Sequence, residues 1–338
     1  MTKEHGYDEG LARALDGLLE VSVVGSFSRA GYEIRRRTEH WSDPDRLDGK
    51  TMIVTGASSG IGQATAIELA RLGAEVWLVG RNPDRLRAAQ QMAEGAGGKG
   101  RIHAAEVDLV SARAVAGFVD QVSSAHREIH ALIHNAGAYF PRYGVADDGA
   151  GILVERTLAT HVLAPFRLSW LLSPQLFAAE RSVIVTVSSG GMYAQRFDPE
   201  HIDVVSEGYS GGAAYARAKR DQVVLSHEWA RRWGEFGVAS YAMHPGWVHT
   251  PGLVSGLPHF AKLRFLLRTP AQGADTVAWL AADEPRRTMA LAPTDGFWLD
   301  RRPRGEYYLP TTRRSRSESE RDGAALWEWS ADRTGLGH

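Results

Sequence analysis

From residue 50 onward, short apolar runs alternate with longer segments in which apolar residues recur every three or four positions. The runs predict strands and the longer segments predict helices. The predicted strands are 51–55, 75–79, 101–107, 130–133, 183–187, 238–243 and an edge strand at 297–299. The predicted helices are 60–72, 83–94, 112–126, 151–176 and 213–233. This alternation predicts an α/β fold, a Rossmann-type doubly wound parallel sheet with helices on both faces.

Segments outside this alternation set the predicted domain organisation. We expect an N-terminal helical extension over 1–42, one Rossmann domain over 43–310, and a tail over 311–338. In the tail, the charged residues 311–323 predict a polar linker that need not be ordered, followed by a short C-terminal helix with Leu326, Trp327 and Trp329 on its apolar face. Inside the domain, we expect functional loops at 190–212 and 251–269, the second a mobile lid.

The extension contains an amphipathic helix, because apolar residues recur there at helical spacing. These residues are Leu11, Leu15, Leu18, Leu19 and Val23. The favoured interpretation is a helix packed on the main domain. The alternative is an element that covers a pocket or lies on a membrane surface, with Arg35, Arg36 and Arg37 near lipid phosphates.

Composition excludes several classes of function. The 338 residues carry a formal net charge of −1, which predicts no nucleic-acid partner, and the chain has no cysteine for disulfides or thiolate metal sites. The polar residues 1–10 do not resemble a signal peptide, and no stretch of about 20 nearly uncharged residues is present to span a membrane. We therefore expect a cytoplasmic protein in which peripheral membrane contact stays possible. The oligomeric state does not follow from the sequence.

A glycine-rich turn, TGASSGIG at 55–62, lies between the first strand and its helix. Gly56 permits the tight turn, Gly60 lets the backbone approach a pyrophosphate, and Gly62 allows close packing of helix on strand. The helix N-terminus, at Ile61 and its neighbours, then offers free amides to the phosphates. This context predicts a dinucleotide site.

The end of the second strand favours one cofactor. An Asp or Glu at this position holds the ribose 2′-hydroxyl of NAD, whereas an arginine accommodates the 2′-phosphate of NADP. The chain has Arg81-Asn82 there and no carboxylate, and the hydroxyls of Ser58 and Ser59 could add contacts. The sequence thus predicts NADP(H) as cofactor.

A tyrosine and a lysine four residues apart, Tyr215 and Lys219, share one face of a predicted helix. The ordinary pKa of a tyrosine is about 10, and a neighbouring ammonium should lower it toward the range useful for proton transfer. The strand 183–187 ends in Ser188-Ser189, where a hydroxyl can stabilise developing charge on a carbonyl oxygen. These residues predict reduction of a carbonyl or oxidation of an alcohol.

Together these motifs resemble the short-chain dehydrogenase/reductase family. The similarity runs in order through TGASSGIG at 55–62, Asp108-Leu109, Asn135-Ala136-Gly137, VTVSS at 185–189, YARAK at 215–219, and Pro245-Gly246 with Val248 and Thr250. It implies that Asp108 lies near the adenine and Asn135 near the cofactor side of its strand. It also implies that Ser189 is the catalytic serine, that Lys219 holds the nicotinamide ribose, and that Thr250 touches the carboxamide.

Other stretches are similar to one branch of this family that has no established substrate. They are SSGGM at 188–192, KRDQVVLSHEWA at 219–230, MHPGW at 243–247 and QGADT at 272–276. One position departs from the family pattern: His161 stands where an asparagine usually helps to hold a water beside the lysine. We predict that His161 faces Lys219, stays neutral at pH 7 and replaces this asparagine in a proton relay.

Two further questions concern metals and the substrate. No predicted helix carries a His-x-x-x-His pair, although the chain has 13 histidines, so we expect no metal. If loop aromatic residues line the pocket, the substrate is bulky and apolar; the candidates are Tyr193, Phe197, Tyr209, Trp247, Phe260 and Phe265. The rival hypothesis is a cofactor-binding regulatory or interaction protein without turnover, and a cofactor-oxidation assay would separate the two.

Overall fold

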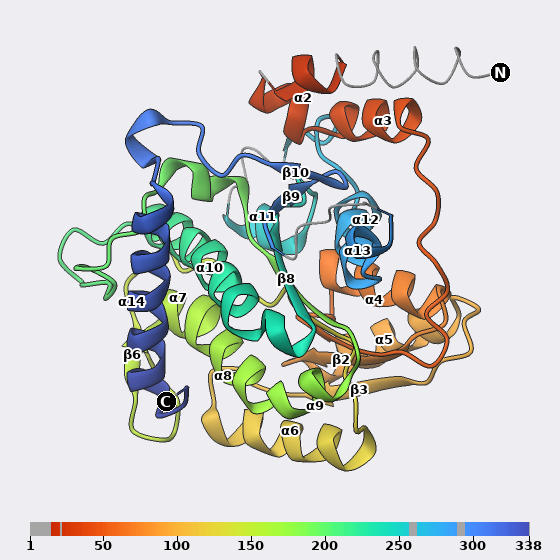
Figure 1. Ribbon diagram of the computed structural model, residues 1–338, viewed down its shortest axis with the longest axis horizontal. Coiled ribbons are helices and arrows are strands. Elements are labelled where there is room, and N and C mark those ends of the chain that lie inside the picture. Colours follow the sequence, from red (N-terminus) through yellow and green to blue (C-terminus); the bar gives the residue numbers. More distant parts are fainter. Residues whose placement is uncertain (1–14, 21, 257–261, 289–294, 338) are drawn as a thin grey trace.

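The computed structural model describes residues 15–20, 22–256, 262–288 and 295–337 (Figure 1). Its centre is an eight-stranded sheet in the order β10-β9-β8-β7-β4-β1-β2-β3. The strands are β1 Thr51–Thr55, β2 Glu75–Gly80, β3 Ile102–Glu106, β4 Ala131–His134, β7 Ser182–Val187, β8 Val238–Met243, β9 Phe297–Leu299 and β10 Arg302–Arg304. All neighbours pair in parallel except β9 and β10, which are antiparallel. The predicted doubly wound fold is confirmed.

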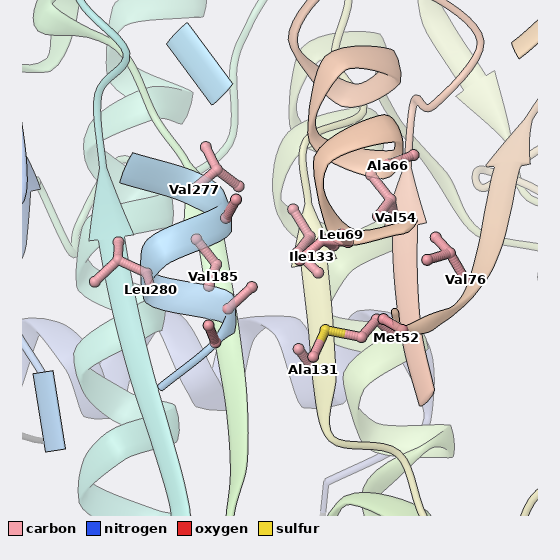
Figure 2. Packing of buried hydrophobic residues seen from close by; sticks show 14 of the residues in the cluster. Met52, Val54, Ala66, Leu69, Val76, Ala131, Ile133, Val185, Val277 and Leu280 are labelled. Atoms are coloured by element: carbon pink, nitrogen blue, oxygen red, sulfur yellow. The ribbon is translucent and has the colours of Figure 1, made fainter. Parts of the chain in front are cut away.

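Alternating side chains of each buried strand serve two hydrophobic cores. In β1, Met52 and Val54 pack into one core, and Ile53 packs into the other. The first core lies under α4 (Gly60–Arg71), α5 (Pro83–Glu94) and α12 (Pro270–Ala281), as Figure 2 shows for Leu69 and Val277. The second lies under α6 (Ala112–Ala125), α8 (Ala164–Leu171) and α10 (Gly211–Trp233).

The predicted helix over 151–176 is wrong at both ends. Residues 153–155 form β6 (Leu153–Glu155), which pairs with β5 (Val145–Asp147) around a turn with two glycines at positive φ. The helical part starts with α7 (Arg156–Leu158), widens into a π-helical segment (Ala159–Leu163), and continues as α8. A separate α9 (Ser173–Ala178) follows.

Two predictions at the C-terminal side also need correction. Strand β9 is not the edge of the sheet, because β10 pairs outside it. The predicted linker is wrong from Arg316 onward, where α14 (Arg316–Thr334) begins. Ser315 and Glu318 cap this helix reciprocally, which stabilises its charged first turn. Trp327 of α14 packs on α8 and α10, alongside which α14 runs in Figure 1.

The described part of the N-terminal extension packs on the domain, as favoured. Residues 15–20 are helical, and α2 (Val23–Phe27) and α3 (Arg29–Thr38) follow. Arg35 is buried and donates to Asp16 at 2.7 Å and to Asp300 at 2.7 Å. Placing Arg35 against lipid phosphates is therefore wrong, because three carboxylates already surround it: Asp16, Glu20 and Asp300.

The predicted lid begins as a short helix, α11 (Pro251–Gly256), and its next residues, 257–261, lie outside the described residues. Its far end is anchored, since buried Arg268 forms an ion pair with Asp300 at 2.6 Å and donates to the carbonyls of Ser26 and Phe27. Within the described ranges, no helix is long and apolar enough to cross a bilayer.

Candidate active site

The glycine-rich turn connects β1 to α4 at the carboxyl edge of the sheet. Gly56 and Gly60 have φ of +64° and +60°, which L side chains rarely adopt. A Cβ on Gly62 would lie 2.5 Å from the carbonyl oxygen of Gly56, so this glycine permits close packing of helix on turn. The hydroxyl of Ser59, at the N-cap, makes no hydrogen bond to the first turn of α4. These amides are thus available to a phosphate.

The segment after β4 closes against this turn. Asn135 donates from Nδ2 to the carbonyl of Thr55 at 2.9 Å, and the amides of Asn135 and Ala136 both donate to Thr55 Oγ1. A Cβ on Gly56 would lie 2.8 Å from Cα of Ala136. Asn135 therefore joins β1 to β4 beside the cofactor edge, and the amide group of its side chain is already hydrogen-bonded within the protein.

The residues expected near the adenosine half surround the end of β2. Arg81 is exposed, and Ser58 lies against Gly80, on which a Cβ would be 3.5 Å from Cβ of Ser58. Asn82 caps α5 by accepting from the amide of Arg85 at 2.9 Å. Asp108 is exposed beyond β3. In contrast, the side chains of Leu109 and Ile61 pack on the hydrophobic cores, which leaves only their main chains for a cofactor.

The loop after β8 reaches the same glycine turn from the other side. A Cβ on Gly60 would lie 3.3 Å from Cγ2 of Thr250. Val248 is buried against Gly273, Pro245 is buried, and Gly246 has φ of +74°. The structure thus places Thr250 beside the phosphate-binding turn, while Val248 supports the loop from below.

The two serines after β7 have separate roles. Buried Ser188 donates to the carbonyl of Lys219 at 2.7 Å and so anchors α10 to the sheet. Ser189 is half-buried, and its hydroxyl lies near enough to Tyr215 to favour the ionised form of the tyrosine. Ser189, rather than Ser188, therefore faces the reacting position. Tyr139 lies edge-on to Tyr215 at 6.2 Å between ring centroids and forms part of the same wall.

The pKa of Tyr215 is raised by burial, and the nearby hydroxyl of Ser189 offsets this rise only in part. The expected direction, a pKa lowered by Lys219, is therefore wrong for this arrangement. Burial also lowers the pKa of Lys219 to about 7, so its ammonium is only partly present at neutral pH. The charge of the lysine is weakened by the same burial that raises the pKa of the tyrosine.

Lys219 is held by two acceptors. Its Nζ donates to the carbonyl of Val187 and to Oε1 of Gln222, each at 2.9 Å. The Nε2 of Gln222 donates in turn to the carbonyl of His161 at 2.9 Å. All three side chains are buried. Gln222 is a site residue that sequence reasoning missed, although it follows Lys219 by three positions on the same helix face.

The carbonyl of His161 is free for Gln222 for a local reason. In an α-helix this carbonyl would accept from the amide of the residue four positions later. That residue is Pro165, which has no amide hydrogen. The chain forms a π-helical segment here, in which the amide of Ala164 donates to the carbonyl of Ala159. Gln222 supplies the donor that the proline cannot.

The ring of His161 faces the site but does not contact Lys219 through a hydrogen bond. Its Nε2 lies 2.9 Å from the carbonyl oxygen of Ala138, which identifies Nε2–H as the donor, and its edge meets Tyr215 at 5.5 Å between centroids. Burial first and the charge of Lys219 second lower its pKa to about 3. The predicted neutral histidine is confirmed, but its link to Lys219 runs through the main chain and Gln222.

Aromatic residues from distant segments pack around the chain that follows Ser189, mostly inside the hydrophobic cores. Phe27 of the extension packs on Gly190, where a Cβ would lie 2.7 Å from its ring, and meets Trp247 at 6.0 Å between centroids. Tyr193 stacks on Tyr308 at 4.1 Å. Two of the aromatic residues predicted to line the pocket are structural instead: Phe197 is buried in a core, and Tyr209 donates to the carbonyl of Phe140. A third, Phe260, lies outside the described residues.

Comparison with known proteins agrees with this geometry. The family model described as short chain dehydrogenase matches residues 50–256. The chain belongs to this family. Dehydrogenase/reductase SDR family member 12 of Bos taurus is 36% identical over 88% of this chain and 90% of its own length. This relative is a member of the branch of the family that the sequence resembles, so the resemblance is confirmed.

Other relatives of this short-chain dehydrogenase differ in name and source. A protein of Streptomyces sp. (strain C5), called putative daunorubicin C-13 ketoreductase DnrU, is 34% identical over 78% of this chain and 87% of its own. A crystal structure of an uncharacterised protein from Mycobacterium paratuberculosis superimposes with a TM-score of 0.66 at 26% identity, covering 88% of this chain and 98% of that one. The chain is thus an oxidoreductase of the short-chain type with a Rossmann fold.

Proposed function

We propose that this short-chain dehydrogenase interconverts a carbonyl and an alcohol with NADP(H), and that Tyr215 is its general acid and base. The observation that carries the proposal is the position of Tyr215 between the hydroxyl of Ser189 and a buried Lys219, whose Nζ lies 5.5 Å from the tyrosine ring centroid and is held by two acceptors. A residue that transfers a proton needs this fixed position within hydrogen-bond reach of the substrate oxygen.

The chain's own groups define the proton path. In reduction, Tyr215 donates its phenolic proton to the substrate oxygen, and Ser189 donates a hydrogen bond that stabilises charge on that oxygen. The ammonium of Lys219 stabilises the phenolate that remains. His161 and Gln222 position Lys219 through the carbonyl of residue 161. Bound NADP(H) supplies or accepts the hydride.

The cofactor proposal rests on the end of β2. Exposed Arg81 follows the strand, Ser58 lies beside it, and the two residues after the strand include no carboxylate. A guanidinium can form a forked, charge-assisted contact with a 2′-phosphate, whereas NAD offers only a hydroxyl there. The residues present fit NADP(H) better than NAD(H).

The substrate is proposed to be bulky and apolar or lipid-like. Tyr139 is exposed beside Tyr215 and presents aromatic surface to the reacting residues. Half-buried Trp247 packs on the buried Phe27 next to Gly190 and adds to this surface. The name of the Streptomyces relative describes a putative ketoreductase that acts at C-13 of daunorubicin. A cytoplasmic location, with peripheral membrane contact possible through the exposed Leu18 and Val23, is proposed as well.

The test is NADPH oxidation by the purified protein over a panel of ketones and aldehydes that ranges from acetone-sized to polycyclic. We expect turnover that rises with apolar size and falls about 10²- to 10⁴-fold in Tyr215→Phe, which loses only the transferable proton. Tyr143→Phe, at an exposed position, is the matched control. Tight NADPH binding without turnover on any member would favour the regulatory alternative.

A further inference from the structure

Phe27 of the N-terminal extension fills the space between two segments of the candidate active site. It lies at the corner where α2 ends and α3 begins, and it is only 4% exposed. Its ring belongs to a third hydrophobic core, which the turn after Ser189 shares with α10, β8 and β9. The other buried residues of this core are Met192, Tyr193, Val223, Ala242, Phe297 and Leu299. A residue from outside the predicted Rossmann domain thus packs directly behind the site.

The ring of Phe27 lies against the turn that follows Ser189. A Cβ on Gly190 would be 2.7 Å from Cε2 of Phe27, so the ring and the main chain are in close contact. The ring also stacks on Tyr193 at 6.2 Å between centroids. The turn is the 3₁₀ segment Gly190–Ala194, which begins directly after Ser189. A shift of this turn would therefore move Ser189.

Phe27 also holds the loop that follows β8. Its ring meets the rings of His244 at 4.2 Å and of Trp247 at 6.0 Å between centroids. Its carbonyl accepts from the amide of Trp247 at 2.8 Å. This loop continues to Thr250, which lies beside the phosphate-binding turn. Phe27 therefore connects the turn after Ser189 with the segment that borders the proposed cofactor site.

Buried charges fix the extension in this position. Arg35 of α3 donates to Asp300 at 2.7 Å, and Arg268 donates to the same carboxylate. Arg268 also donates to the carbonyl of Phe27 at 3.1 Å. All three charged side chains are buried, and a helix as short as α2, with five residues, depends on such tertiary contacts. The ring of Phe27 is thus held by fixed protein groups.

We propose that Phe27 is a positioning residue, whose ring sets the place of the turn after Ser189. This role rests on the proposed function, in which Ser189 stabilises charge on the substrate oxygen. Misplacing a reacting group by about 1 Å can lower a rate about 100-fold, even when the substitution lies far from the chemistry. The ring controls the turn, whereas the main chain of Phe27 holds Trp247. Loss of the ring should therefore impair turnover and spare cofactor binding.

The test is steady-state kinetics of Phe27→Leu on the carbonyl that the wild type reduces fastest. We expect kcat to fall about 10- to 100-fold with an unaltered KM for NADPH, because the main-chain bond to Trp247 survives the substitution. Phe118→Leu is the matched control, since Phe118 is equally buried but lies in the second core, edge-on to Trp77. It should lower Tm as Phe27→Leu does and leave kcat unaltered.

Gly190→Ala disturbs the same contact from the other side and leaves the extension intact. Its methyl group would press on the ring of Phe27, so the turn must shift and kcat should fall about 10-fold or more, again with an unaltered KM for NADPH. Gly117→Ala in α6, where a Cβ would meet nothing within 4 Å, is the control for this variant. This pair tests the contact even if Phe27→Leu does not fold.

Hydrogen–deuterium exchange gives a measurement that does not depend on turnover. In Phe27→Leu, the amides of residues 190–195 should exchange about tenfold faster than in the wild type, while those of α4 keep their rates. A wild type that reduces no carbonyl contradicts the proposed function alone, and the exchange rates then decide the role of Phe27. The positioning role is overturned if residues 190–195 exchange equally in Phe27→Leu and Phe118→Leu, or if a working enzyme keeps its kcat in Phe27→Leu.

Discussion

Oε1 of Gln222 accepts a hydrogen bond of 2.9 Å from Nζ of Lys219, while Nε2 of the same amide donates to the carbonyl of His161. One side chain thus satisfies the buried lysine of α10 and the carbonyl that Pro165 leaves unpaired in the π-helical segment. The lysine is positioned by a chain of fixed protein groups, and its protonation should respond when that chain is cut.

Gln222→Leu removes both hydrogen bonds at nearly constant volume. The charged form of Lys219 loses an acceptor, so its pKa should fall further below about 7, and the alkaline limb of the kcat profile should move to lower pH. Loss of one charge-assisted hydrogen bond predicts a fall in kcat of about tenfold or more. Gln121→Leu on the exposed face of α6 is the control. A lower Tm with an unmoved pH profile would mean that Gln222 is only structural.

Arg81→Asp should reverse or abolish the cofactor preference. The wild type should bind NADPH more tightly than NADH, and the variant should lose about 10- to 100-fold in affinity for NADPH, because a carboxylate then faces the 2′-phosphate. Fluorescence titration with both cofactors measures this. Arg127→Asp, an equivalent charge change beyond α6, should leave both affinities unaltered. Equal affinity of the wild type for the two cofactors would remove the basis of the claim.

The elements that the sequence predicts best are those with local signals. The helix α5 begins and ends where predicted, and its start is marked by the cap residue Asn82 and by Pro83 in its first turn. The tail shows how charge can mislead: 311–323 was expected to be a linker, yet a capping box at Ser315 and Glu318 and a buried pair of Arg314 with Asp322 stabilise a helix there. The capping box was visible in the sequence, whereas the pair depends on how α14 packs.

In the candidate active site, too, local sequence signals predict some features, whereas others depend on how distant segments pack. The order of Ser189, Tyr215 and Lys219 along the chain predicts a catalytic group, and the structure brings the three together. The role of Gln222 could not be predicted, because it depends on the π-helical segment around His161 and on how α10 packs against it. The contact of Arg35 with Asp300 joins positions 265 residues apart, and no local pattern signals it.

The ring of His161 fills space that only glycine leaves open. A Cβ on Gly137 would lie 2.6 Å from Cε1 of His161. Gly137→Ala should therefore push the ring away from the carbonyl of Ala138 and lower kcat. His161→Asn should retain activity, because an amide can still donate to that carbonyl, while His161→Leu should lower it.

A double-mutant cycle makes this prediction specific. The smaller asparagine leaves room for a methyl group, so Gly137→Ala should cost less kcat in the His161→Asn background than in the wild type. Steady-state kinetics of the four proteins, with Tm as a check on folding, measures the coupling. Strictly additive effects would show that the contact between positions 137 and 161 does not control activity.

Cofactor binding should be coupled to proton uptake at Lys219. The depressed pKa of about 7 means that this lysine is mostly neutral at pH 8 in the free protein, whereas its ordinary pKa would keep it charged. Ribose hydroxyl oxygens that accept from the ammonium would raise that pKa, so binding at pH 8 should take up a proton, and binding at pH 6, where the lysine is already charged, should not do so through this group.

Calorimetric titration of NADPH in two buffers of different ionisation enthalpy gives the number of protons taken up at each pH. Lys219→Met removes the titrating group and serves as the baseline, because any protons exchanged by the 2′-phosphate remain in that variant. The difference between wild type and Lys219→Met should approach one proton at pH 8 and zero at pH 6. An equal exchange in both proteins at pH 8 would show that Lys219 is already fully charged before the cofactor binds, and that burial does not lower its pKa as its position in the structure requires.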